Sequence, residues 1–268
     1  MKIDMKKIAL LISTGLFAQT TLADTSNTQS VFDAFTNCDS SFFYQLKNNA
    51  EDFKDITDLV IKDNIAYIPV EDVTKRGDTT TTMFKQPIQY RGLNIVGYQN
   101  IYIETSFLGQ FYYWGFIIDG SVDQVKQSLK QLPWEQYNTV GYIANPQIFL
   151  RYNQNKSWEH NPYSIEGVVP KTLTAEKSLY LEPLDDNQVH LICSIQGDIE
   201  RPNLYEIRPD MKYIIEELTA IEEAKMKAYE EQLKQKREER KKAEAEKNES
   251  NTNTTENQSN EEIEHEKI

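Results

Sequence analysis

Residues 109–121, GQFYYWGFIIDGS, are apolar on both sides of an extended chain. Side chains alternate between the two faces of a β-strand, so Phe111 and Tyr113 fall on one face while Tyr112 and Trp114 fall on the other. An exposed aromatic platform would need one polar face or flanking charge. The segment is therefore predicted to be a central strand covered on both sides. Gly115 within it is expected to admit a bulky neighbour or a bend.

A helix is predicted directly after this strand. Asp119 and Gly120 form a turn, and Ser121 with Gln124 three residues later fits a capping box. An apolar stripe follows at helical spacing, and a proline ends it. The stripe and the proline are Val122, Val125, Leu129, Leu132 and Pro133.

Four further segments alternate between apolar and polar residues, which is typical of half-buried strands. They are 98–105, 147–152, 178–182 and 188–196. This alternation favours antiparallel sheets that expose one face to water. In 147–152, Ile148 and Leu150 are expected to point inward. In 188–196, the inward face contains Cys193, and His190 lies on the wet face.

An early helix is predicted after Asp39, which is a suitable N-cap. Its apolar residues recur at helical spacing and are Phe42, Phe43, Leu46, Ala50 and Phe53. Residues 30–210 therefore predict one α+β domain, in which helices pack on one face of an antiparallel sheet.

Residues 1–23 have the pattern of a signal peptide. A basic start (Lys2, Lys6 and Lys7) precedes a short apolar run, and small residues precede Ala23. We expect cleavage after Ala23 and a mature protein in the periplasm or secreted, with no stable membrane insertion. The alternative is an uncleaved anchor, for which the apolar run is short.

The only two cysteines of the chain are Cys38 and Cys193, and both follow this segment. An oxidising compartment favours a disulfide between them. The alternative is two separate buried thiols. Neither cysteine belongs to a C-x-x-C motif, and two isolated cysteines do not make a zinc site.

The C-terminal part has a different composition. Residues 211–247 predict a charged helix, of which the first part carries an apolar face and is expected to dock. Glu–Lys pairs four residues apart, such as Glu223 with Lys227, favour its continuation in solvent. A coiled coil is a weaker interpretation, because apolar positions are not sustained. Residues 248–268 are polar, of low complexity, and expected to be disordered.

Charge and motifs exclude several classes of function. A net charge of −13 argues against binding to nucleic acids and to anionic membranes. The familiar nucleophile, metalloprotease and phosphate-binding motifs do not occur, and no metal or cofactor is expected. An enzyme without a recognisable motif would have to use His160, Glu159 and Asp185. His265 lies in the expected tail.

Three segments are similar to exported proteins of Gram-negative bacteria that have no assigned activity. They are CDSSFF at 38–43, YYWGF at 112–116 and CSIQG at 193–197. The resemblance covers about 160 residues, implies a periplasmic address and transfers no site.

Aromatic residues supply the remaining signal, because the chain has fifteen Tyr and three Trp and exposed Tyr and Trp anchor interfaces. In 98–105, Ile101 and Ile103 are expected inward and the alternate residues outward. The candidate binding surface joins that outward face to a loop, and consists of Tyr98, Asn100, Tyr102, Glu104, Trp158, His160 and Tyr163.

The leading hypothesis is a periplasmic protein-binding protein, of the inhibitor or immunity type, for an envelope-acting toxin or hydrolase. Its acidic charge would speed association with a basic partner. The alternatives are a binding module for cell-wall glycan or peptide, and an enzyme without a recognisable motif. The expected partner is another envelope protein.

Overall fold

The computed structural model describes residues 25–75, 77–107, 109–152, 157–164, 170, 172–184 and 187–264. The expected signal peptide, 1–23, lies outside these residues. The chain divides between Ile207 and Arg208 into two units, which are described separately.

The first unit contains both helices and strands. Its helices are α1 (Thr25–Phe35), α2 (Ser41–Asn48), α3 (Ala50–Phe53), the 3₁₀ turn η1 (Asp78–Thr80), α4 (Val122–Ser128) and α5 (Arg201–Ile207). Its strands are β1 (Val60–Lys62), β2 (Ile65–Tyr67), β3 (Thr81–Tyr90), β4 (Leu93–Thr105), β5 (Gly109–Asp119), β6 (Glu135–Gln136), β7 (Tyr142–Leu150), β8 (Trp158–His160), β9 (Thr174–Leu184) and β10 (Gln188–Gly197).

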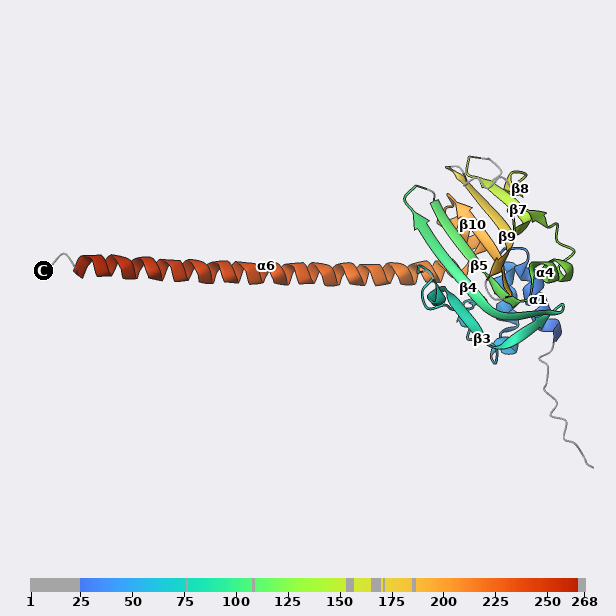
Figure 1. The fold of residues 1–268 in the computed structure, drawn as a ribbon, viewed down its shortest axis with the longest axis horizontal. Helices are drawn as coiled ribbons and strands as arrows, with labels where there is room; N and C mark the ends of the chain where they lie inside the picture. Colours follow the sequence, from blue (N-terminus) through green and yellow to red (C-terminus); the bar gives the residue numbers. More distant parts are fainter. Residues whose placement is uncertain are drawn as a thin grey trace, which may run out of the picture. The chain divides into compact units, whose positions relative to one another are not determined.

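The described strands form an eight-stranded sheet in the order β3-β4-β5-β10-β9-β7-β6, and β8 pairs with β7 (Figure 1). Every pairing in it is antiparallel. A two-stranded sheet of β1 and β2 lies beside α2. The predicted α+β class, with an antiparallel sheet, is confirmed.

Strand β5 is the predicted central strand, because it lies between β4 and β10. Trp114, in the middle of the aromatic run, is fully buried. Gly115 faces β10 so closely that a Cβ atom would lie 2.2 Å from the backbone oxygen of Leu191. Glycine is required here because the neighbouring backbone occupies the space of a side chain.

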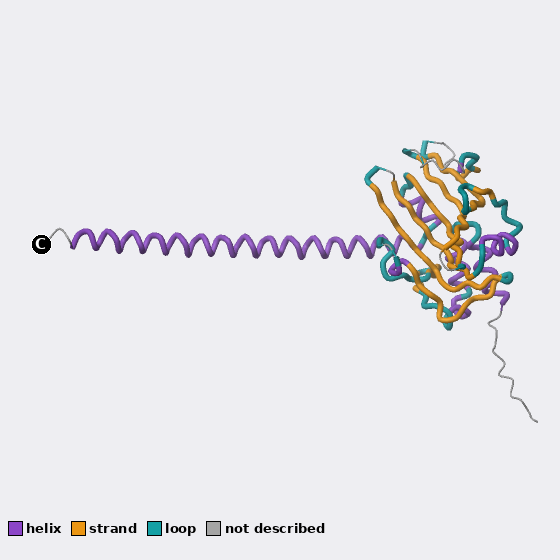
Figure 2. The backbone as a smooth tube through the Cα atoms, in the orientation of Figure 1, coloured by secondary structure: helices purple, strands orange, loops and turns teal. Residues whose placement is uncertain are grey.

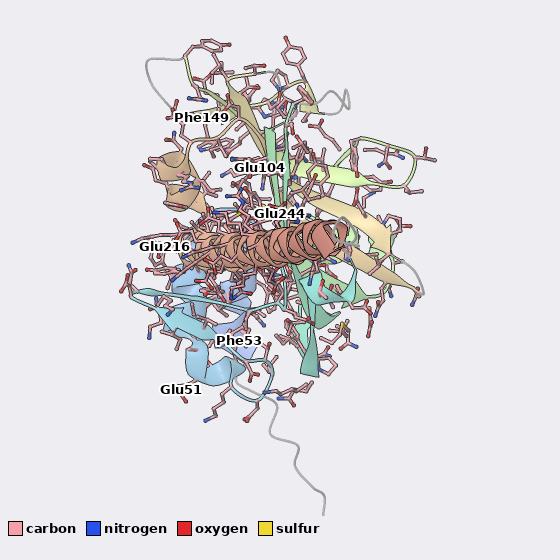
Figure 3. All side chains as sticks on the ribbon, turned by 90° about the vertical axis from the view of Figure 1, so that its left-hand side faces the viewer. Glu51, Phe53, Glu104, Phe149, Glu216 and Glu244 are labelled. Atoms are coloured by element: carbon pink, nitrogen blue, oxygen red, sulfur yellow. A yellow bond between two sulfur atoms is a disulfide. The ribbon has the colours of Figure 1, made fainter. Side chains whose placement is uncertain are left out.

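The helices cover one face of the sheet, which we call the helix-covered face. Phe116 of β5 is its centre, with the rings of Phe32 and Phe35 of α1 each 4.7 Å away and Phe42 of α2 at 5.9 Å. Figure 3 shows labelled Phe53 of α3 to one side of the strands. The apolar helix spacing in the sequence is therefore explained by packing on this face.

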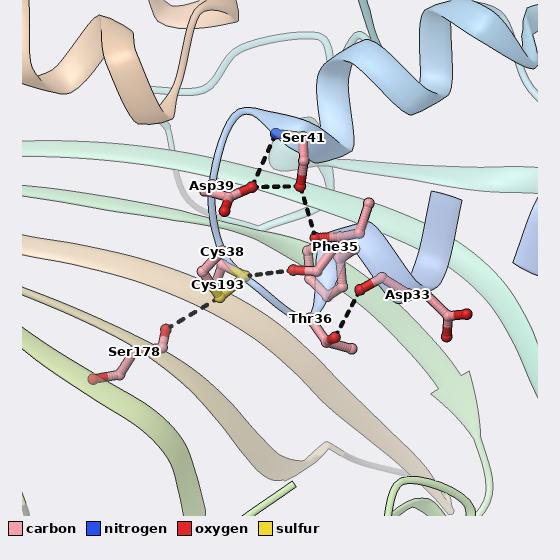
Figure 4. The surroundings of a disulfide bond; sticks show 9 residues. Asp33, Phe35, Thr36, Cys38, Asp39, Ser41, Ser178 and Cys193 are labelled. Atoms are coloured by element: carbon pink, nitrogen blue, oxygen red, sulfur yellow. Dashed lines mark hydrogen bonds between the residues drawn. A yellow bond between two sulfur atoms is a disulfide. The ribbon is translucent and has the colours of Figure 1, made fainter. Parts of the chain in front are cut away.

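A disulfide ties the α1–α2 connection to the sheet. Cys38 and Cys193 have an S–S distance of 2.01 Å and are separated by 155 positions (Figure 4). The predicted disulfide is therefore present. Asp39 lies one residue before the N-cap of α2, Ser40, and its carboxylate accepts a hydrogen bond from the backbone N–H of Ser41 at 2.9 Å.

Helix α4 begins with the predicted capping box. The Ser121 hydroxyl accepts from the Gln124 N–H at 3.3 Å, and the Gln124 side-chain oxygen accepts from the Ser121 N–H at 2.7 Å. This reciprocal pair fixes where β5 ends and the helix starts.

Strand β7 departs from the prediction. Its register shifts between Ala144 and Gln147, which moves later residues to the other face. Phe149 is therefore buried, while Ile148 and Leu150, predicted inward, are only partly covered. The predicted segment lies after this shift, so its alternation is regular and the prediction chose the wrong face: the aromatic Phe149, not its aliphatic neighbours, points to the core.

The second unit contains helix α6 (Asp210–Glu264), drawn as a continuous coil in Figure 2. At its start the Arg208 guanidinium donates to both Asp210 carboxylate oxygens, at 2.9 and 2.7 Å. Side chains are described to Ala245, and from Glu222 onward nearly all are exposed. The backbone of α6 extends past Lys247, where the helix was expected to end. Disorder in 248–268, docking of the first part and a coiled coil remain predictions.

Among the described helices, none combines the length and the apolar character needed to cross a membrane.

Candidate functional site

The predicted binding surface on β4 is wrong for two of its residues. Tyr98 and Asn100 are 0% and 1% exposed. The Tyr98 ring faces the helices and lies 5.5 Å from Phe116 and 6.4 Å from Phe42. The two faces of β4 are exchanged relative to the prediction, because the large tyrosine rings complete the core while Ile101 faces outward.

The same face of β4 reaches solvent toward the end of the strand. The Tyr102 ring stacks on Tyr112 at 4.9 Å, and its hydroxyl donates to the exposed Glu104 at 2.9 Å. Burial raises the pKa of Tyr102 to about 12, with Glu104 as a second cause. This pair is a local contact at a strand end.

The other half of the predicted surface lies elsewhere on the sheet. Trp158 and His160 belong to β8, which pairs with β7, and Tyr163 follows it and is 67% exposed. Trp158 contacts Phe149, with ring centroids 5.5 Å apart. Since β4 and β8 are five strand positions apart in the sheet order, roughly 24 Å separates them at the usual strand spacing. The seven residues therefore do not form one surface.

The candidate catalytic set is not assembled either. Glu159 and His160 are adjacent in β8, so their side chains leave opposite faces of the strand. Asp185 lies outside the described residues. His160 instead borders a hollow of about 450 Å³ together with Asp39, Gln147 and Lys177. Burial lowers the pKa of Lys177, whose ammonium lies 5.4 Å from the Trp158 ring.

A different site emerges on the face of the sheet opposite the helices, which we call the open face. A hollow of about 510 Å³ lies there, within the usual size range of ligand sites. We call it the open-face hollow. Its lining consists of Gln99 and Ile101 of β4, Tyr113 of β5, His190, Ile192 and Gln196 of β10, Glu176, Tyr180 and Glu182 of β9, and Tyr137 and Ser164 from connecting segments.

The register of the central strands brings these side chains together. His190 is opposite Glu182, and Ile192 is opposite both Tyr180 and Gly115. Gly115 adds no side chain to this face, so neighbouring groups line the hollow. The requirement for glycine at position 115 thus concerns the site as well as the fold.

Hydrogen bonds and ring contacts hold the lining. The Tyr137 hydroxyl donates to Oε1 of Glu182. The rings of Tyr137 and Tyr180 meet edge to face, with centroids 5.2 Å apart and planes at 83°. The Gln196 amide nitrogen donates to the Ser194 hydroxyl at 2.8 Å and to the Tyr180 hydroxyl at 3.4 Å. These contacts fix the orientation of the polar groups before any ligand arrives.

Burial changes the protonation of the lining. It raises the pKa of Glu182 and of Glu176, and lowers that of His190. Burial and the charge of Glu182 raise the pKa of Tyr113 to about 12, and burial also raises the pKa of Tyr180. At neutral pH, His190 is therefore uncharged, and its Nε2 has no hydrogen-bond partner among the described residues.

The sequence supplied part of this site. Alternation in 188–196 predicted that His190 would lie on the face away from the core, and it lines the open-face hollow. The sequence did not show that β9 and β10 are neighbours in this register, or that Tyr137 joins them from outside the strands. Among the described residues, no group of three or more His, Cys, Asp or Glu side chains could hold a metal ion.

Comparison with protein-family models, curated proteins and solved structures found no match to this chain. The geometry of the open-face hollow is therefore the basis for a functional conclusion.

Proposed function

We propose that this protein is an exported binding protein that holds part of an envelope partner protein in the open-face hollow, in an inhibitor- or immunity-type role. The observation that carries the proposal is the hollow itself. It combines three tyrosine rings with carboxyl and amide groups whose positions are fixed by hydrogen bonds. A concave site with aromatic walls and a few oriented polar groups is the usual form of a ligand site.

Export is supported by the disulfide between Cys38 and Cys193, because disulfides persist in oxidising compartments and are rare in the cytosol. The pattern of residues 1–23 and the resemblance to exported bacterial proteins point to the same compartment. The periplasm would also supply the envelope partner.

Binding accounts for the lining better than catalysis does. Glu176 and Glu182 are six positions apart on β9, so their Cα atoms are separated by roughly 20 Å along the strand. Two carboxyls that cleave one glycosidic bond lie much closer together.

Cell-wall glycan is a second candidate ligand. The rings of Tyr113 and Tyr180 and the amides of Gln99 and Gln196 line the same hollow. Aromatic rings can stack on sugars, and amides hydrogen-bond to hydroxyl groups. Sedimentation of the full chain with purified peptidoglycan would support this candidate.

Site-specific photocrosslinking in cells of the source organism tests the leading proposal. A benzoylphenylalanine residue replaces Ile101 in the hollow, and the control replaces Ile61 of β1, which is 49% exposed and outside the hollow. We expect a defined protein adduct from position 101 that is absent from position 61. Equal labelling from both positions, or no protein adduct from position 101, would overturn the proposal.

A further inference from the structure

We infer that the open-face hollow binds a cation, the guanidinium or ammonium group of an Arg or Lys side chain that the partner protein presents. The inference rests on the proposed function, which supplies the partner, and specifies the chemistry that the hollow recognises.

The charges of the lining favour a cation. Glu176 and Glu182 contribute carboxyl groups, and the described residues of the lining include no Lys or Arg. His190 is the remaining group that could carry positive charge, and it is neutral near pH 7 because burial lowers its pKa. A cation beside Glu182 therefore meets its carboxyl group, and the described lining places no positive charge against it.

The carboxyl group of Glu182 is positioned to receive a donor. Tyr137 occupies Oε1 through its hydroxyl, and no described residue donates to Oε2. Arg and Lys form charge-assisted hydrogen bonds with carboxylate oxygens, which are stronger than bonds between neutral groups. The Tyr137 contact fixes the side chain and leaves the second oxygen available.

The tyrosine rings provide the second element of recognition. Tyr113, Tyr137 and Tyr180 line the hollow, and the rings of the last two meet edge to face. A cation over an aromatic face is attracted by the ring quadrupole, more strongly when water is excluded. Rings combined with carboxyl groups distinguish a cation from a neutral group of the same shape.

Two described lysines that lie over aromatic rings do so outside the hollow. Lys126 of α4 lies 3.5 Å from the Tyr142 ring, and Lys177 lies over Trp158. Lys126 and Lys177 are absent from the lining of the hollow. The described lining thus supplies no cation of its own, and the net charge of −13 attracts a basic partner over distance.

Three small probes test the inference by calorimetric titration of the full mature chain near neutral pH. They are N-acetyl-arginine amide, N-acetyl-lysine amide and N-acetyl-citrulline amide, of which the last is a neutral isostere of the first. We expect the arginine probe to bind at least about tenfold more tightly than the citrulline probe, as expected for a charge-assisted hydrogen bond with a cation–π contact. This comparison uses the unmodified protein, and equal affinity for the arginine and citrulline probes would overturn the inference.

A pair of charge-matched variants locates the binding. Glu182→Gln still accepts the Tyr137 hydroxyl and should weaken binding of the arginine probe about fivefold to tenfold. Glu51→Gln, on α3 with its side chain 91% exposed, removes the same charge far from the hollow and should leave the affinity unchanged. Equal effects of the two variants would show that general charge, and not the hollow, binds the probe.

The outcomes separate the inference from the proposed function. A protein adduct from position 101 together with no preference for the arginine probe leaves the proposed function intact and overturns the cationic ligand. Preference for arginine with no adduct from position 101 keeps the ligand class and overturns the envelope partner. Absence of both overturns both.

Discussion

His190 of β10 lies directly opposite Glu182 of β9, with both side chains in the open-face hollow. Burial moves their pKa values in opposite directions, since it disfavours the charged form of each. His190 is therefore kept neutral. The Glu182 carboxylate takes up a proton at a higher pH than an ordinary Glu does. Protonation of either group adds positive charge to the hollow.

Binding of the arginine probe should weaken as the pH falls below neutral. The pKa of Glu182 is raised above 4.5, so its carboxylate is lost at a higher pH than that of an ordinary Glu. The pKa of His190 is lowered below 6.5, so its repulsion begins at a lower pH than for an ordinary His. The groups that face the pair are Tyr113, Tyr137, Tyr180 and Glu176. The hydroxyl groups of these tyrosines stay neutral as the pH falls below 7.

A pH series of calorimetric titrations checks this dependence. In Glu182→Gln, the affinity for the arginine probe should fall less as the pH is lowered, because the titrating carboxyl group is gone. In His190→Gln, the fall in affinity that Glu182 causes should remain. A constant affinity between neutral pH and the ordinary Glu value of 4.5 would contradict the assignment.

Loss of the disulfide should lower the free energy of unfolding by about 2–5 kcal/mol. The bridge closes a loop across 155 positions, which restricts the unfolded chain strongly. Denaturant unfolding of the Cys38→Ser, Cys193→Ser double variant measures the effect. Reduced wild-type protein is the control and should match the variant. A stable double variant alongside a destabilised reduced protein would point to damage by the reductant.

Gly115→Ala should destabilise the fold by about 1–3 kcal/mol or more, because the new methyl group would overlap the β10 backbone. The distance to the Leu191 oxygen is 2.2 Å, and a backbone atom inside the sheet cannot move away easily. Gly97→Ala is the matched comparison, since its nearest contact is the flexible Met83 sulfur at 2.9 Å. Thermal unfolding should place Gly97→Ala between wild type and Gly115→Ala. The reverse order would mean that β10 can shift.

Ser121→Ala should cost about 1 kcal/mol of stability through loss of the α4 cap. The hydroxyl accepts the Gln124 N–H at the first turn, and alanine leaves that donor to water. Gln127→Ala, at an exposed position of the same helix, is the control and should change stability by less than about 0.5 kcal/mol. Chemical denaturation of both variants gives the comparison.

The sequence predicted features that depend on nearest neighbours along the chain. The doubly apolar run identified β5 as central, and Ser121 with Gln124 identified the start of α4. Alternation in 188–196 also placed Cys193 on the inward face, and it is buried. In each case one strand or one turn contains the whole signal.

Features that depend on strand register or on aromatic packing could not be predicted from patterns within a single strand or turn. Tyr98 was assigned to solvent because a hydroxyl marks it as polar, yet its ring area favours the core. In β7 the aromatic Phe149 takes the inward position that was assigned to Ile148 and Leu150. The hollow combines β9, β10 and Tyr137, whose proximity follows from the sheet order and not from any local pattern.

The position of β10 has a consequence for the order in which the molecule can be completed. It is the last strand of the described sheet to be synthesised, yet it lies between β5 and β9 in the interior. Before residues 188–197 are synthesised, β5 lacks one of its two neighbouring strands and Cys38 lacks its disulfide partner. The part of the hollow that β10 lines is also missing. The two halves of the sheet can therefore pair only after this last segment is present. The same segment supplies the second cysteine of the disulfide and part of the lining of the hollow.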